Sequence, residues 1–78
     1  MTNNDSYAVA SAVTTSDATD FTQGRCRALY IGGAGNLVAI VGGVAITFNG
    51  ATAGSVIPVS ASRVNATGTT ATNIVALY

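Results

Sequence analysis

The 78-residue sequence has very little charge and lacks most of the side chains that enzymes use. It holds three arginines and three aspartates, and no lysine, glutamate, histidine or tryptophan. Charged residues make up 8% of the chain, against about 25% in a typical globular domain. General acid–base catalysis needs positioned His, Glu, Asp, Lys or Tyr side chains, and of these only Asp and Tyr are present. We therefore expect a protein that is not an enzyme.

Cysteine and histidine are also too few for a covalent or metallic cross-link. The single cysteine, Cys26, cannot form an internal disulfide. Without histidine or a cluster of cysteines or carboxylates, the sequence favours neither a zinc nor a calcium site, and no cofactor is expected. No His or Lys is present to activate Cys26, so we expect it to be a small apolar core residue.

The sequence has neither a basic surface nor a long apolar run. Its formal net charge is zero, which argues against nucleic acid as a partner, because phosphates require a basic face. No apolar run approaches the roughly 20 residues of a membrane span. The start of the chain, "MTNNDSYAVAS", lacks the basic and apolar regions of a signal peptide.

The short length predicts that the protein assembles. A chain of this size buries only about 60% of its unfolded surface, so small folds commonly add disulfides, metals or oligomerisation. The first two are not expected here, which leaves a homo-oligomer. A neutral surface of Thr, Ser, Asn and Gly suits contact with further copies or with another protein better than a free monomer.

The sequence predicts an extended N-terminal arm over residues 1–22 and a single β-domain over residues 23–78. The arm is rich in Ser, Thr, Ala and Asn and contains every aspartate, with one short strand expected near Tyr7 to Val13. It either stays disordered or becomes ordered on assembly, by adding a strand to the sheet edge of a neighbour. Asp17 and Asp20 would then meet arginines of an adjacent copy. The residues expected to contact a neighbouring subunit or another protein of a larger assembly are Tyr7, Val9, Val13, Asp17, Asp20, Arg25 and Arg27.

From Arg25 onward, short apolar runs alternate with glycine-rich turns, which predicts an all-β fold, a small antiparallel β-sandwich or barrel. In "RCRALYI", Leu29 and Ile31 share one face, and "GGAGN" (32–36) is expected to be a turn. Gly42-Gly43 between two apolar runs predicts a hairpin. Its register pairs Val41 with Val44, Ala39 with Ile46, and Leu37 with Phe48, six residues expected to form the core together. Pro58 predicts an edge or a bulge.

Two local patterns are better explained by structure than by binding. "GGAGN" could cradle an anion through its backbone N–H groups, but no lysine follows it and no helix is expected after it, so a plain turn is favoured. The five aromatic residues could form a platform for a sugar, although packing in the core or between subunits is favoured.

Four stretches resemble a known family: "VTTSDATDF", "RALYIGGAGN", "ITFNGATAGSVIPV" and "RVNATGTTATNIVALY". They are similar to the small head spike-base proteins of tailed phages and phage-like gene transfer agents. The resemblance covers roughly residues 13–78. It implies a structural virion protein on the capsid surface, with the major capsid protein as a partner and a spike fibre as a possible one. A pentameric ring is favoured because it would match a capsid vertex, with a trimer as the alternative. The other functions left open are a capsid cement or decoration protein without a fibre, a glycan-binding surface module, and a tail or baseplate component.

Overall fold

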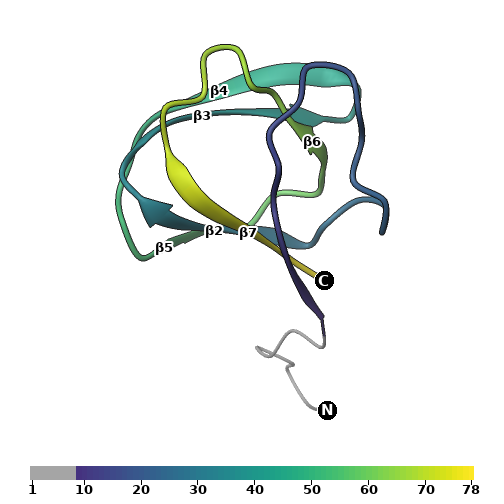
Figure 1. Ribbon diagram of the computed structural model, residues 1–78, viewed down its shortest axis with the longest axis horizontal. Helices are drawn as coiled ribbons and strands as arrows, with labels where there is room; N and C mark the ends of the chain where they lie inside the picture. Colours follow the sequence, from purple (N-terminus) through teal and green to yellow (C-terminus); the bar gives the residue numbers. More distant parts are fainter. Residues whose placement is uncertain (1–8) are drawn as a thin grey trace.

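The computed structural model describes residues 9–78 as a two-layered antiparallel β-structure without helices. The strands are β1 (Ala10–Ala12), β2 (Ala28–Gly33), β3 (Gly35–Val41), β4 (Val44–Ala51), β5 (Ser55–Ile57), β6 (Ala61–Val64) and β7 (Thr72–Leu77). A four-stranded sheet has the order β1-β7-β2-β5, and a three-stranded sheet has the order β4-β3-β6. Figure 1 shows the two sheets as opposite walls of the domain. The expected all-β sandwich is confirmed. No helix in residues 9–78 is long and apolar enough to cross a bilayer.

Glycines allow the chain to pass directly from one sheet into the other. The expected turn over residues 32–36 is much shorter than the sequence indicated, because β2 continues to Gly33 and β3 begins at Gly35. A Cβ at Gly35 would lie 2.5 Å from the backbone nitrogen of Ala71. The segment that leads into β7 therefore runs too close to this corner for any side chain, and strand structure extends through the glycines.

The hairpin across Gly42-Gly43 is confirmed together with its register. β3 and β4 pair Val41 with Val44, Ala39 with Ile46, and Leu37 with Phe48. Gly42 and Gly43 have φ angles of 60° and 81°. A two-residue type I′ turn needs positive φ at both central positions, and its twist matches that of the flanking strands.

The core lies between the two sheets and is made of small and medium apolar side chains. Its buried members are Cys26, Leu29, Ile31, Leu37, Ala39, Ala61, Val64, Ala71, Ile74 and Ala76. Cys26 is buried as expected, and burial raises the pKa of its thiol. Alternation along β2 places Leu29 and Ile31 inward, both fully buried, and Tyr30 outward.

The prediction that all six hairpin residues form the core together is wrong for two of them. Leu37 and Ala39 are fully buried, whereas Val44 and Ile46 are 57% and 40% exposed. β4 is an edge strand, and within residues 9–78 the one strand that pairs with it is β3. The register is as predicted, and it puts Val44 and Ile46 on the inner face of β4. The rest of the described chain does not cover that end of the strand, so the two side chains remain open to solvent.

Candidate contact surface

The described part of the expected arm, residues 9–22, lies against the sheets of the same chain. β1 pairs with β7, and the Val13 N–H donates to the Ile74 carbonyl at 2.9 Å. Further along, the N–H groups of Ser16 and Phe21 donate to β6 carbonyls, each at 2.9 Å. Val13 and Phe21 also pack against the core. This segment therefore covers hydrogen-bonding edges of both sheets without needing a partner chain.

The two described aspartates are held by groups on and beside β6. Asp17 accepts hydrogen bonds from the Thr67 hydroxyl at 2.6 Å and from the Thr67 N–H at 2.9 Å. These bonds stabilise the carboxylate and lower the pKa of Asp17. Asp20 forms a salt bridge with Arg63, with 3.2 Å between Nη1 and Oδ1. The Asp20 side chain is 64% exposed, so the pair contributes about 0–1 kcal/mol.

The structure thus gives Asp20 a partner that the sequence did not suggest, because Arg63 is 43 residues away.

Arg25 and Arg27 lie on the exposed segment before β2, where the Arg27 N–H donates to the Leu77 carbonyl at 2.7 Å. Val9 is 45% exposed. Tyr7, the remaining predicted contact residue, lies outside the described residues.

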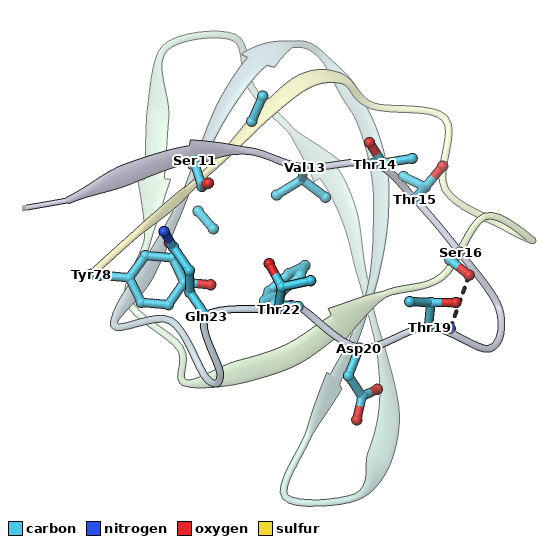
Figure 2. A pocket seen from close by; sticks show the side chains of 13 residues that line it. Ser11, Val13, Thr14, Thr15, Ser16, Thr19, Asp20, Thr22, Gln23 and Tyr78 are labelled. Atoms are coloured by element: carbon cyan, nitrogen blue, oxygen red, sulfur yellow. Dashed lines mark hydrogen bonds between the residues drawn. The ribbon is translucent and has the colours of Figure 1, made fainter.

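A pocket of about 420 Å³ lies between the arm and the end of β7. Figure 2 shows the hydroxyl-bearing side chains of the arm around it, with Tyr78 on one side. Part of this polar lining already serves the fold: the Ser16 hydroxyl oxygen accepts from the Thr19 N–H at 3.0 Å, and the Tyr78 hydroxyl donates to the Gly24 carbonyl at 3.0 Å. The pocket-lining residues are Ser11, Ala12, Val13, Thr14, Thr15, Ser16, Thr19, Asp20, Phe21, Thr22, Gln23, Ala76 and Tyr78.

The chemistry of this pocket suits hydrogen bonding rather than catalysis or metal binding. Asp20 and Tyr78 are its only titratable lining residues, and Asp20 is paired with Arg63. Between residues 9 and 78, no group of three or more His, Cys, Asp or Glu side chains is placed to hold a metal ion. Hydroxyls and amides of this kind can bind a neutral polar group, such as a sugar or a peptide backbone.

Sequence reasoning missed two exposed apolar pairs. Val44 and Ile46 form the first pair, near the turn end of β4. The second pair lies on the outer face of the four-stranded sheet, where Tyr30 and Val56 are direct neighbours across β2 and β5 and are 37% and 46% exposed. Alternation along each strand could have placed Tyr30 and Val56 outward, but the missing cover over Val44 and Ile46 depends on the arrangement of the two layers.

No protein-family model matches the chain, and comparison with curated proteins finds no match. A solved structure does match: a chain in the capsid of a native gene transfer agent (GTA) particle, computed with C5 symmetry. The two chains superpose with a TM-score of 0.82 and share 37% sequence identity. The match covers 92% of this chain and 83% of the other.

Proposed function

The chain belongs to the family of the phage-like capsid protein represented by that gene transfer agent chain, and from this premise we propose that it is the base subunit of a spike on the head of a tailed phage or phage-like particle. It is a structural protein of the virion capsid. The observation that carries the proposal is the 37% identity sustained over 92% of the chain, because a match of this extent spans both sheets rather than one shared motif. The residues quoted above for the spike-base resemblance support the finer assignment.

In this proposal the subunit forms a homo-oligomeric ring on the major capsid protein. The matching chain comes from a particle computed with C5 symmetry, and five copies around a fivefold vertex satisfy the same symmetry. The 8% charge content supports assembly, because a surface buried between copies needs few charges to remain soluble. A trimer is the alternative, and a fibre is the partner that would rest on the ring.

The proposed attachment surface is the N-terminal arm, residues 1–22, with the arginines that follow it. Val9 is apolar and 45% exposed at the point where the described arm begins. Asp17, Asp20, Arg25 and Arg27 are exposed along the same segment, and they bring most of the charge of the described chain to this surface. Val9→Asp should leave the domain folded and weaken its binding to particles. Thr52→Asp, at an exposed position after β4, is the matched control, and equal binding by both variants would contradict this role of the arm.

The assignment is tested by removing the gene from the particle and analysing what is lost. A spike base predicts particles that still package DNA but lose both this chain and its fibre from their protein content. Loss of this chain with reduced resistance to heat, and with every fibre retained, would instead identify a cement protein. The hydroxyl-lined pocket supports a second function, glycan binding, which a glycan array on the purified protein would reveal. Particles that normally lack the chain would overturn the proposal.

A further inference from the structure

Two exposed apolar surfaces lie on different sheets of the domain. The tip patch consists of Val44 and Ile46 at the turn end of β4. The face patch consists of Tyr30 and Val56 on the outer side of the four-stranded sheet, continued by the half-buried Val75, which pairs with Tyr30. In Figure 1 the β3–β4 turn and β5 lie toward opposite ends of the domain, so the two patches occupy separate places on its surface.

The tip patch lies on the least protected sheet edge of residues 9–78. β4 is eight residues long and contains neither a charged residue nor proline, the features that usually protect an edge strand. The other edges are short or covered. β1 and β5 have three residues each, Pro58 follows β5, and hydrogen bonds from Ser16 and Phe21 cover β6.

The charged residues of the described chain do not belong to the strands that carry the two patches. They lie within residues 17–27 and at Arg63, and none lies on β2, β4, β5 or β7. Neither patch therefore repels the other, and neither offers a charged group to a charged partner. This chemistry fits an apolar surface of the same neutral kind, which each copy of the chain carries at its other end.

We propose that the tip patch of one copy packs onto the face patch of the next copy, and that this head-to-tail contact closes the ring. The inference rests on the ring assembly of the proposed function and identifies its interface. A fivefold ring requires contacts between two different surfaces, because identical surfaces that meet about a twofold axis produce a dimer that stops growing. Two unlike apolar patches at separate ends of one small domain meet this requirement.

The surface of the chain is large enough for such a ring. A stable interface covers about 800 Å² on each partner, so two of them would cover roughly a third of the 4465 Å² that the chain exposes. The four exposed side chains would then form the apolar centres of the contacts, and the neutral Thr, Ala and Asn residues around them would form the rim. This burial accounts for the scarcity of charge on the surface.

The test uses two single variants of the full chain and their mixture. Val44→Asp disables the tip patch, and Val56→Asp disables the face patch. Both side chains are about half exposed, so each variant should keep the fold, which circular dichroism checks. Thr47→Asp is the matched control, because it places the same charge at an exposed position on the opposite face of β4.

Sedimentation velocity at micromolar concentration should give a ring for the wild type and for Thr47→Asp. Each patch variant alone should be a monomer, with association weakened about 30-fold or more. An equal mixture of the two should form a 1:1 dimer, because the mixture offers one intact tip patch and one intact face patch for each pair of chains. Dimers of either variant alone, or a mixture that stays monomeric, would overturn the head-to-tail contact.

The oligomeric state of the wild-type protein by itself also tests the proposed contact. A monomeric wild type would overturn it, and if that monomer still bound particles, the capsid role would stand. A wild-type ring that behaves as predicted but is absent from purified particles would instead overturn the proposed function and leave the interface assignment intact.

Discussion

The hairpin provides a direct test of the core, because two of its residues of equal size differ in burial. Leu37 is fully buried between the sheets, and Ile46, expected from the sequence to share its environment, is 40% exposed. Replacing a buried leucine by alanine removes its apolar contacts and leaves a cavity, so Leu37→Ala should lower the free energy of unfolding by about 3–5 kcal/mol. Ile46→Ala leaves no closed cavity and removes a side chain already partly in water, so about 1 kcal/mol is expected.

These values are large for a domain whose total stability should be about 4–12 kcal/mol. A loss of 3 kcal/mol corresponds to a melting temperature at least about 12 °C lower. Thermal and urea denaturation should be followed at a concentration where the wild type is monomeric, because assembly would add to the effect of Ile46. Equal losses for the two variants would refute the assignment of Leu37 to the core and of Ile46 to the surface.

Four further substitutions test the arm and the glycine positions. Asp17→Asn should lower the urea midpoint at pH 7. The bonds from Thr67 lower the pKa of the Asp17 carboxyl in the folded protein below its usual value of 3.8, so the ionised carboxylate stabilises the fold at pH values above 3.8. That difference should fade as the pH drops below 3.8 and through the folded pKa, and a difference independent of pH would contradict the cause. Gly42→Ala should cost about 1–2 kcal/mol in thermal denaturation because φ is +60°, with Gly42→Asn costing less. Gly35→Ala should cost more than Gly42→Ala, since its Cβ would meet the Ala71 backbone, and an equal or smaller cost would argue against the close approach.

The features predictable from sequence were those set by neighbouring residues. The hairpin register followed from Gly42-Gly43 and the apolar runs on either side, because a two-residue turn leaves only one way to align its strands. The inward positions of Leu29 and Ile31 followed from alternation along a single strand.

The remaining features depended on contacts between distant segments. Asp17 and Thr67 are separated by 50 residues, so the sequence pattern gave no sign that the arm would lie beside β6. Val44 and Ile46 have the correct alternation for a core, yet their exposure depends on which strands of the other sheet reach β4. For the same reason the two apolar patches could be recognised only once the layers were placed.

Cryo-electron microscopy of purified particles tests the central claim, that this chain is a capsid protein on the head surface, most directly. The account predicts density on the outside of the head that fits the two-layered β-domain, repeated around the symmetry axis of a vertex, with the arm toward the shell. Particles whose heads carry no such density, and whose protein content lacks the chain, would contradict the account.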